Sequence, residues 1–286
     1  MKRILFAVAL LLLLPGFAAC EAKAPSSETT AVKTQEATEP VLPQTTTETP
    51  ATTVTEPVTT AAQPKKDKIR IACIGDSLTY GTGSSNPSVF SYPVQLQKYL
   101  NAAQSETLYT VLNYGKPSAY AINNKEYDFT YPSKNSNAYT ESEQYKNSLN
   151  CQPDIVIIML GTNDAYAAAA NKNVSEKYTA SLEKIVDTYL ALESTPEVIL
   201  MLCPSRFDNA TRLKSVTNII HPAIRDVAER KEIRLIDAYT MTNEALADRA
   251  TAVREKVFNS DGVHLSDKGY EMLAELIGRT ILGEND

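Results

Sequence analysis

Short runs of apolar residues recur along the chain from about residue 68 onward, and more polar stretches separate them. The runs are rich in branched aliphatic residues and lack the polar and apolar alternation of a strand with one solvated face. Continuous apolarity over so few residues predicts strands that are covered on both faces. The predicted strands are residues 69–75, 109–115, 154–161, 197–204 and 233–238.

The stretches between these runs place apolar residues three or four positions apart, which is the spacing of one helix face. The predicted helices are residues 92–103, 174–194, 213–231 and 266–282. Alternating strands and helices indicate a parallel sheet with helices on both faces. We therefore expect residues 68–286 to form one α/β domain, a three-layer α/β/α sandwich around a five-stranded parallel sheet.

Polar or small residues stand where several of the predicted strands end. In a parallel sheet of this kind the functional crevice lies beyond the carboxyl ends of the strands. We expect five residues at this rim. They are Ser77 after the first strand, Gly115 at the end of the second, Asn163 after the third, and Asp261 and His264 after the fifth.

The chain has only two histidines, and one of them, His264, follows Asp261 by three positions in "DGVHLSDKGY". A serine, a histidine and an aspartate at one rim supply the parts of a nucleophilic triad. In such a triad the histidine takes the serine proton and the carboxylate fixes the imidazole tautomer. The sequence therefore predicts Ser77 as nucleophile, His264 as general base and Asp261 as the residue that orients it.

Four blocks occur in a fixed order between residues 69 and 282, and they are "GDSLTYG", the glycine of "LNYGKP", "GTND" and "DGVHLSDKGY". Together they resemble the SGNH hydrolases, also called GDSL esterases and lipases. The resemblance implies a flavodoxin-like fold and carboxylic ester hydrolysis. It also implies an oxyanion hole made by the backbone N–H groups of Ser77 and Gly115 and the side-chain amide of Asn163. The G-x-S-x-G elbow of the α/β-hydrolases is absent, since Thr79 stands at its second glycine.

The surroundings of Gly115 leave its role open, because Lys116 and Pro117 follow it and proline has no N–H to donate. Lys116 is then a candidate for contact with an anionic substrate. The tyrosine-rich segment after Gly115 opens on the same rim, so Tyr120 is a candidate for contact with a sugar ring. Packing of these tyrosines within their own segment is the alternative. Arg206 and Phe207, which follow the fourth strand, are further candidates for the substrate pocket.

We expect structural roles for three other polar residues. Asp76 and Asp164 flank the motif residues and are expected to cap turns or helices. His221 lies within a helical pattern and directly precedes a proline, so we expect a packing or surface residue.

The first twenty residues, "MKRILFAVALLLLLPGFAAC", combine a basic start, an apolar run and small residues after a Pro-Gly break. This pattern predicts an export signal, and its apolar run is too short for a span of about 20 residues. "GFAAC" resembles a bacterial lipobox, which predicts a lipid anchor on Cys20. Phe17 departs from the leucine usual there, so cleavage without lipidation, and hence secretion, is the alternative.

Residues 21–67 are rich in Thr, Pro, Glu and Ala and contain no glycine and no aromatic residue. A segment of this composition buries too little apolar surface to offset the entropy of ordering. We expect a disordered linker that holds the domain off the membrane.

Charge and cysteine content exclude several classes of partner. The chain has 28 basic and 34 acidic residues, a formal net charge of -6 that repels phosphate backbones, so we expect no nucleic-acid partner. Its four cysteines include Cys20, and the remaining odd number form no C-x-x-C pair. Because H-E-x-x-H is also absent, we expect no metal and no cofactor.

Taken together, these features predict a membrane-anchored, cell-surface serine esterase, with acetylated carbohydrate as its leading substrate. Action on lipid or acyl-thioester substrates, as a lysophospholipase or thioesterase, is the alternative enzyme function. A catalytically inactive glycan-binding module is the alternative from another class.

Overall fold

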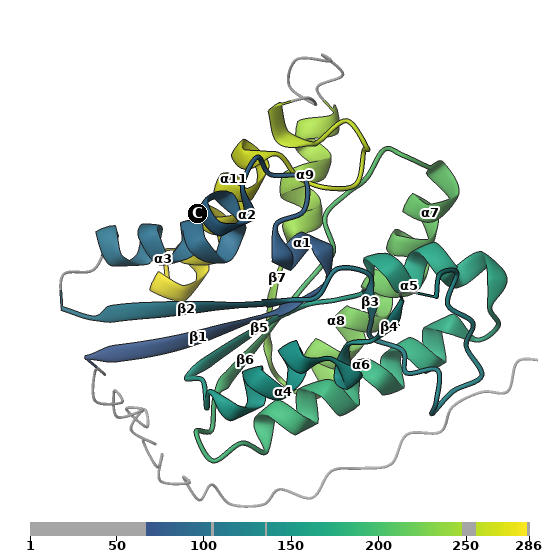
Figure 1. The fold of residues 1–286 in the computed structure, drawn as a ribbon, viewed down its shortest axis with the longest axis horizontal. Helices are drawn as coiled ribbons and strands as arrows, with labels where there is room; N and C mark the ends of the chain where they lie inside the picture. The colour runs from purple at the N-terminus through teal and green to yellow at the C-terminus, as the bar shows by residue number, and fades with distance from the viewer. Residues whose placement is uncertain (1–66, 104–105, 135, 248–255, 285–286) are drawn as a thin grey trace, which may run out of the picture. The chain divides into compact units, whose positions relative to one another are not determined.

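The computed structural model describes residues 67–103, 106–134, 136–247 and 256–284 (Figure 1). The predicted export signal, the Cys20 anchor and the linker lie outside these residues. Within them, no helix combines the length and the apolarity needed to cross a bilayer.

The central sheet has five parallel strands in the order β2-β1-β5-β6-β7. The strands are β1 (Lys68–Gly75), β2 (Leu108–Gly115), β5 (Ile155–Met159), β6 (Glu197–Met201) and β7 (Arg234–Ile236). Each coincides with a predicted apolar run, and the predicted five-stranded α/β fold is confirmed. The last three strands end two or three residues earlier than the apolar runs, because the chain turns into the loops at the rim.

Helices cover both faces of the sheet (Figure 1). On one face lie α1 (Ser77–Tyr80), α2 (Pro87–Phe90), α3 (Tyr92–Ala103), α9 (Ala238–Ala247) and α11 (Asp267–Leu282). On the other lie α4 (Glu143–Asn150), α5 (Thr162–Ala167), α6 (Val174–Leu190), α7 (Ala210–Ser215) and α8 (His221–Arg230), with short 3₁₀ turns at Tyr139–Glu141 and Ala168–Ala170.

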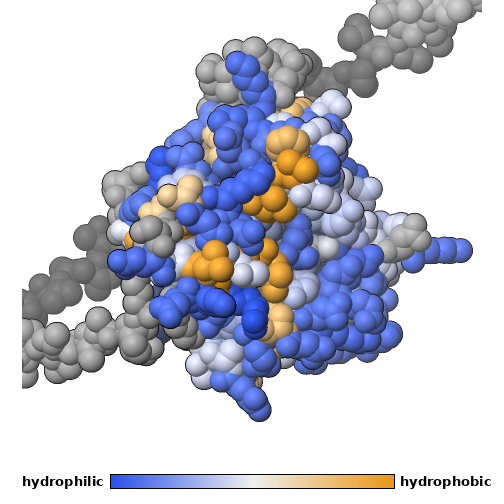
Figure 2. All heavy atoms as spheres, turned by 60° about the vertical axis from the view of Figure 1, so that its left-hand side comes forward, coloured by the Kyte–Doolittle hydropathy of each residue, from blue (hydrophilic) through white to orange (hydrophobic). Residues whose placement is uncertain are grey.

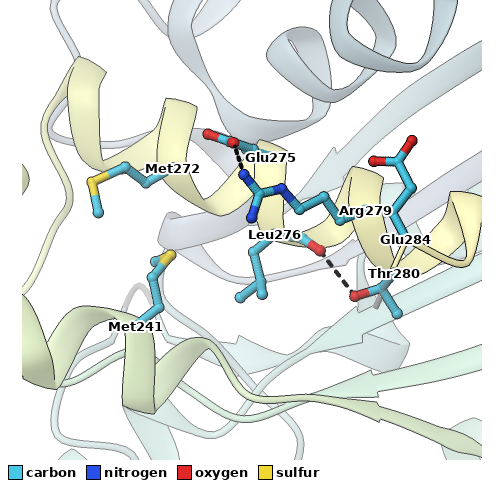
Figure 3. A pocket seen from close by; sticks show the side chains of 7 residues that line it. All are labelled: Met241, Met272, Glu275, Leu276, Arg279, Thr280 and Glu284. Carbon is cyan, nitrogen blue, oxygen red and sulfur yellow. Dashed lines mark hydrogen bonds and ion pairs between the residues drawn. The ribbon is translucent and has the colours of Figure 1, made fainter. Parts of the chain in front are cut away.

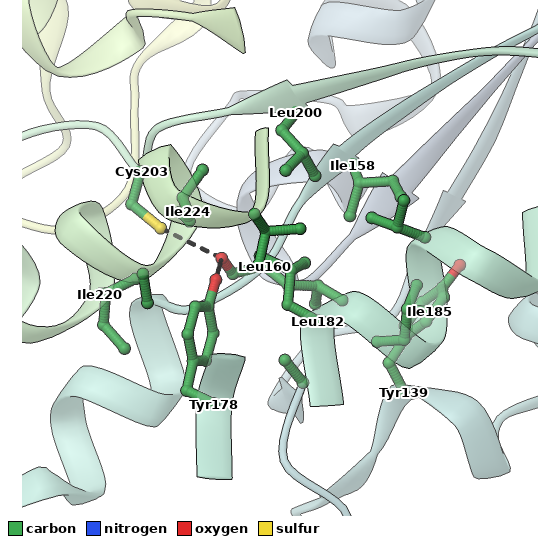
Figure 4. Packing of buried hydrophobic residues seen from close by; sticks show 14 of the residues in the cluster. Tyr139, Ile158, Leu160, Tyr178, Leu182, Ile185, Leu200, Cys203, Ile220 and Ile224 are labelled. Carbon is green, nitrogen blue, oxygen red and sulfur yellow. Dashed lines mark hydrogen bonds between the residues drawn. The ribbon is translucent and has the colours of Figure 1, made fainter. Parts of the chain in front are cut away.

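Side chains along each strand alternate between two cores, which explains why the runs are apolar throughout. In β1, Ile71 and Cys73 pack toward α3 and α11, whereas Ala72 and Ile74 pack toward α6 and α8. Figure 4 shows the second core, where the Tyr178 hydroxyl donates a hydrogen bond of 2.7 Å to the Leu160 carbonyl. The polar end of this buried tyrosine is thereby satisfied.

A small parallel sheet of β3 (Ala119–Tyr120) and β4 (Asn137–Ala138) organises the segment after β2. Tyr120 is 2% exposed, and its ring packs against Phe129 and Tyr131 at centroid distances of 5.9 and 4.6 Å. The candidate role of Tyr120 in the substrate pocket is therefore wrong, because its ring is enclosed by its own segment.

The helix predicted over 213–231 contains a π-helical turn at Val216–Ile220 between α7 and α8. In a π-helical turn each N–H bonds a carbonyl five residues back instead of four. The turn ends two residues before Pro222, which has no N–H to contribute to a regular helix. His221 is buried, with Nε2 3.0 Å from the Cys203 carbonyl oxygen and its ring edge-on to Tyr239. The packing role expected for His221 is confirmed, and burial lowers its pKa.

The strand order fixes where a site is expected. From β1 the chain moves to β2 on one side, and it later returns to β5 on the other side of β1. Loops that leave the carboxyl ends of β1 and β5 therefore diverge, which opens a crevice at this switch point. Ser77 and Asn163 follow these two strands.

Candidate active site

Ser77 is the first residue of α1, directly beyond the end of β1. Asp76 caps this helix as predicted, and its Oδ1 accepts a 2.9 Å hydrogen bond from the Leu78 N–H. A Cβ at Gly75 would lie 2.1 Å from Thr79 Oγ1 and 2.5 Å from the Met159 carbonyl oxygen, so only glycine lets α1 approach the sheet this closely. As the first helical residue, Ser77 has no intrahelical acceptor for its N–H, which remains available to a ligand.

His264 and Asp261 lie on one tight loop before α11. An antiparallel bridge between Phe258 and Leu265 closes this loop, and the Asn259 N–H donates a 2.8 Å hydrogen bond to the His264 carbonyl. Gly262 adopts a φ of 73° inside the loop, a left-handed conformation that glycine accepts at little cost. The loop therefore holds both side chains within one turn of the chain.

Hydrogen bonds connect the three predicted triad residues. His264 Nε2 lies 2.9 Å from Ser77 Oγ, and His264 Nδ1 lies 2.6 Å from Asp261 Oδ2. Burial raises the pKa of Asp261, but hydrogen bonds from His264 and from the Val263 N–H outweigh it and leave this pKa below its usual value. An ionised carboxylate only accepts, so Nδ1 carries the proton and Nε2 is free to accept from the Ser77 hydroxyl.

The loop after α1 packs against His264. A Cβ at Gly83 would lie 2.6 Å from the His264 Cβ, and Gly83 has a φ of 94°. The Gly83 carbonyl accepts a 2.8 Å hydrogen bond from Asn259 Nδ2, and the Thr82 carbonyl accepts one of 2.6 Å from the Tyr270 hydroxyl. This loop thus fixes the distance between Ser77 and His264.

Asn163 and Asp164, in the first turn of α5, hold the segment that follows β2. Asn163 Nδ2 donates a 2.9 Å hydrogen bond to the Ala119 carbonyl, which also fixes the orientation of the amide. Asp164 is fully buried and accepts hydrogen bonds of 3.1 and 3.0 Å from the N–H groups of Ala121 and Ile122. Asp164 therefore anchors a loop, whereas the sequence predicted a cap.

Gly115 does not line the cavity beside Ser77, contrary to the prediction. Its N–H donates a 2.9 Å hydrogen bond to Asn113 Oδ1, so it is not directed at a ligand. A Cβ at Gly115 would lie 2.1 Å from the Tyr80 backbone nitrogen, and this close approach of two backbones explains the glycine. Ser118 lies at the cavity instead, with a φ of 63° that is unusual for a residue with a side chain.

The cavity at the switch point has a volume of about 280 Å³. It is lined by Ser77, Thr82, Pro117, Ser118, Thr162, Asn163, Tyr166, Arg206, Asp208, Arg212, Val263 and His264. Arg206 is thus at the cavity as predicted, whereas Lys116 and Phe207 are not among its lining residues. Phe207 packs on Phe258 at 5.6 Å, and its N–H donates to the Gly262 carbonyl, so it supports the histidine loop.

Sequence reasoning missed several of the lining residues, and two of them had a usable signal. Tyr166 stands three positions after Asn163 on α5, a spacing that puts both on one helix face. Asp208 stands two positions after Arg206 and binds it. Arg212 and Ser118 carried no such signal, because their position depends on long-range packing.

A second cavity, of about 340 Å³, lies between α9 and α11 (Figure 3). Its walls include Met241, Met272 and Leu276, and one of its two acidic residues, Glu275, pairs with Arg279. It shares no lining residue with the cavity at Ser77. On the face drawn in Figure 2, hydrophobic side chains gather only in small patches among hydrophilic ones.

Burial raises the pKa of two carboxyl groups beneath the site, to about 7 for Asp76 and about 6 for Asp164. For Asp76 the nearby charge of Asp164 adds to this effect, and the Leu78 N–H and the charge of Arg206 oppose it. Asp76 Oδ2 also lies 3.4 Å from Asn163 Nδ2. Asp76 thus connects the first turn of α1, where Ser77 lies, with the side chain of Asn163.

The described residues contain no group of three or more His, Cys, Asp or Glu side chains placed to hold a metal ion. The cysteines among them, Cys73, Cys151 and Cys203, are all free thiols. The expected independence of metal and cofactor stays a prediction.

Comparison with known proteins identifies the class. The sequence model of the GDSL-like Lipase/Acylhydrolase family matches residues 73–272, most of the chain. The chain belongs to this family, and the SGNH assignment made from the four sequence blocks is confirmed.

Two curated relatives are similar in sequence. An acetylxylan esterase of Xylanibacter ruminicola is 27% identical over 238 residues, which cover 76% of this chain and 44% of that protein. The GDSL esterase/lipase WDL1 of Oryza sativa subsp. japonica is 26% identical over 147 residues, covering 46% of this chain and 54% of that protein. The chain therefore spans about half the length of these relatives.

Solved structures share the fold. The acetylxylan esterase Axe2 from Geobacillus stearothermophilus superposes with a TM-score of 0.56 at 21% identity, covering 74% of this chain and 94% of that one. A two-domain esterase active on acetylated mannans, solved with mannopentaose, gives a TM-score of 0.52 at 20% identity. That match covers 76% of this chain and 50% of the other. At these identities the likeness concerns the fold.

Replacing Asp76 by Asn should change how stability depends on pH. The pKa of Asp76 is raised from an ordinary 3.8 to about 7 in the folded protein. Protonated Asp76 therefore contributes stability that is fully present below pH 3.8. This contribution to the free energy of unfolding is lost as the pH rises toward 7. The asparagine does not titrate. The free energy of unfolding of Asp76→Asn relative to wild type should therefore rise between about pH 5 and pH 7, by up to about 1.4 kcal/mol per pH unit.

Urea unfolding at both pH values measures this difference. Ser77→Ala is the control, since it alters the neighbouring residue without removing a carboxyl group. An equal stability difference between Asp76→Asn and wild type at both pH values would contradict the raised pKa.

Proposed function

We propose that this protein is a serine esterase in which Ser77, His264 and Asp261 act as a catalytic triad. The observation that carries the proposal is the hydrogen-bonded series from Ser77 Oγ through His264 to Asp261, opening on a small cavity. Family membership supports the same chemistry.

In the first half of the reaction, Ser77 Oγ attacks the ester carbonyl carbon and its proton passes to His264 Nε2. Asp261 stabilises the imidazolium that forms, through the 2.6 Å hydrogen bond to Nδ1. The tetrahedral intermediate then expels the alcohol oxygen, which takes the proton from Nε2. The products of this half are the free alcohol and an acyl group on Ser77.

In the second half, His264 Nε2 accepts a proton from a water molecule whose oxygen attacks the acyl carbon. The bond from that carbon to Ser77 Oγ breaks, and Oγ takes the proton back from His264. The acid leaves, and the hydroxyl and the neutral imidazole are restored.

We propose that three donors stabilise the oxyanion: the N–H groups of Ser77 and Ser118, and Asn163 Nδ2. All three residues line the cavity. The left-handed backbone of Ser118, adjacent to the Ala119 carbonyl that Asn163 binds, supports its assignment in place of Gly115. The 3.4 Å contact of Nδ2 with Asp76 is long, so this N–H is the one available to the oxyanion.

We propose acetylated carbohydrate as the substrate. A cavity of about 280 Å³ suits a short acyl group. Relatives named as acetylxylan esterases, and a structural neighbour active on acetylated mannans, support an acetyl ester on a glycan.

Replacing Ser77 by Ala should reduce kcat on p-nitrophenyl acetate by about 10⁴-fold or more, because the nucleophile is lost. The wild type should show its highest kcat/KM on acetate in a series of p-nitrophenyl esters up to palmitate. The control is Ser175→Ala, which removes an exposed hydroxyl on α6, outside the cavity.

Retention of substantial activity in Ser77→Ala would contradict the triad. An optimum at long acyl chains would move the substrate to lipids, and no Ser77-dependent turnover of any ester would favour a binding module.

Replacing Asn163 by Ala should lower kcat by about 10²- to 10³-fold, since one oxyanion donor is lost. Ser118→Gly is the comparison, because it removes a hydroxyl and keeps the backbone N–H. Steady-state kinetics on p-nitrophenyl acetate should therefore show a much smaller change in Ser118→Gly. An equal loss in both variants would contradict backbone donation by Ser118.

We also propose that the protein is exported and held at the cell membrane through lipid on Cys20, a proposal supported by the leader sequence. Replacing Cys20 by Ala should then move the protein from the membrane fraction to the soluble fraction. Immunoblots of both fractions measure this change. Unchanged membrane association in Cys20→Ala would contradict the anchor.

A further inference from the structure

One wall of the Ser77 cavity is formed by Arg206, Asp208, Arg212 and Tyr166, here called the arginine wall. Asp208 joins the two arginines. Arg206 donates to both of its carboxylate oxygens, at 2.5 and 2.7 Å, and Arg212 Nη1 donates to one of them at 3.0 Å. The Arg212 guanidinium also lies 3.7 Å from the centre of the Tyr166 ring. These contacts hold both guanidinium groups in place.

The arginine wall holds two guanidinium groups and one carboxylate, Asp208. Asp76, whose pKa the charge of Arg206 lowers, is only partly ionised at neutral pH because burial raises its pKa to about 7. Burial raises the pKa of Asp208, but the hydrogen bonds and charges of Arg206 and Arg212 outweigh it and leave this pKa below its usual value. Asp208 is therefore ionised at neutral pH and neutralises one of the two guanidinium groups. The excess charge is local, because the chain as a whole is negative, at -6.

The arginine wall also has hydrogen-bond donors that the protein does not use. The Arg206 side chain is 4% exposed, and its Nη1 has no hydrogen-bond partner among the described residues. Nη1 of Arg206 is itself enclosed by the protein, so the donors that a bound molecule can reach are those of Arg212. Arg212 is 33% exposed, and the one acceptor recorded for its guanidinium is Asp208, which leaves N–H groups for a ligand.

We propose that the arginine wall binds a substrate carboxylate, so that the preferred substrate is the acetyl ester of an acidic sugar, a uronic acid. The planar guanidinium fork matches the two oxygens of a carboxylate. Ser77 and His264 line the same cavity, so a sugar held at Arg212 brings its ester to the nucleophile. This inference rests on the proposed function and adds a substrate class to it.

The test compares two sugar esters that differ in one group. Methyl glucuronide and methyl glucoside, acetylated at the same hydroxyl, differ only in the carboxylate at the last carbon. The ratio of their kcat/KM values reports recognition of the carboxylate, separately from the chemistry of ester cleavage. For the wild type we expect a ratio of about tenfold or more in favour of the glucuronide, the size expected for a charged hydrogen bond.

Substitutions at Arg212 change the charge of the arginine wall in steps. Arg212→Gln removes the excess charge and should bring the ratio close to one, and Arg212→Glu should bring it below one. Lys214→Gln is the matched control, since it removes the same charge from an exposed position on α7 outside the cavity. It should keep the wild-type ratio. Circular dichroism verifies that each variant is folded.

A wild-type ratio near one, or a preference that survives in Arg212→Gln, would overturn the inference. If p-nitrophenyl acetate is still cleaved in a Ser77-dependent manner, the proposed function stands without it. If neither sugar ester nor p-nitrophenyl acetate is cleaved in a Ser77-dependent manner, the proposed function fails and this inference fails with it.

Discussion

The site depends on one hydrogen bond, 2.9 Å long, between the Ser77 hydroxyl and the imidazole of His264, residues that are 187 positions apart. The fold makes this contact possible because β1 lies inside the sheet, so the loop at its carboxyl end is flanked by those of later strands. Glycines at 75 and 83 allow the approach, since a side chain at either position would collide with Thr79 or His264. Close backbone packing therefore sets the geometry of the hydroxyl and the imidazole.

Around this contact the protein buries ionisable groups, which costs stability. Asp76 and Asp164 are 1% and 0% exposed, and burial raises the pKa of both. Backbone N–H groups offset part of the cost, and in return each carboxyl group fixes a segment of the rim. Asp76 fixes the start of α1, and Asp164 fixes the segment that presents Ser118. Burial of these two carboxyl groups thus lowers the free energy of unfolding but holds both segments of the rim in place.

Much of the fold could be predicted from the sequence, because buried parallel strands need apolar residues on both faces. All five apolar runs became strands. The boundaries of the long helix near 213–231 were less predictable, since the π-helical turn before Pro222 depends on how His221 packs against Cys203 and Tyr239. The small sheet of β3 and β4 left no periodic pattern at all, because each strand has only two residues.

Within the site, Ser77 and Asn163 were predictable because they follow buried strands, and Asp261 and His264 because a serine, a histidine and an aspartate together supply a triad. The structure brings these four residues together at the rim. Gly115 was misassigned, because a glycine required for backbone packing looks in a sequence like one required beside a ligand. Ser118 takes a left-handed conformation without a glycine to signal it, since the hydrogen bonds of Asn163 and Asp164 to the following residues impose its position. Arg212 reaches the cavity through long-range packing, which a local pattern does not record.

The most direct test of the central claim is covalent labelling with a fluorophosphonate, which reacts with a serine hydroxyl that a neighbouring base activates. Intact mass spectrometry followed by peptide mapping identifies the modified residue. The account predicts a single adduct on Ser77 that is lost in His264→Ala. An unlabelled protein, or an adduct on a different serine, would contradict it.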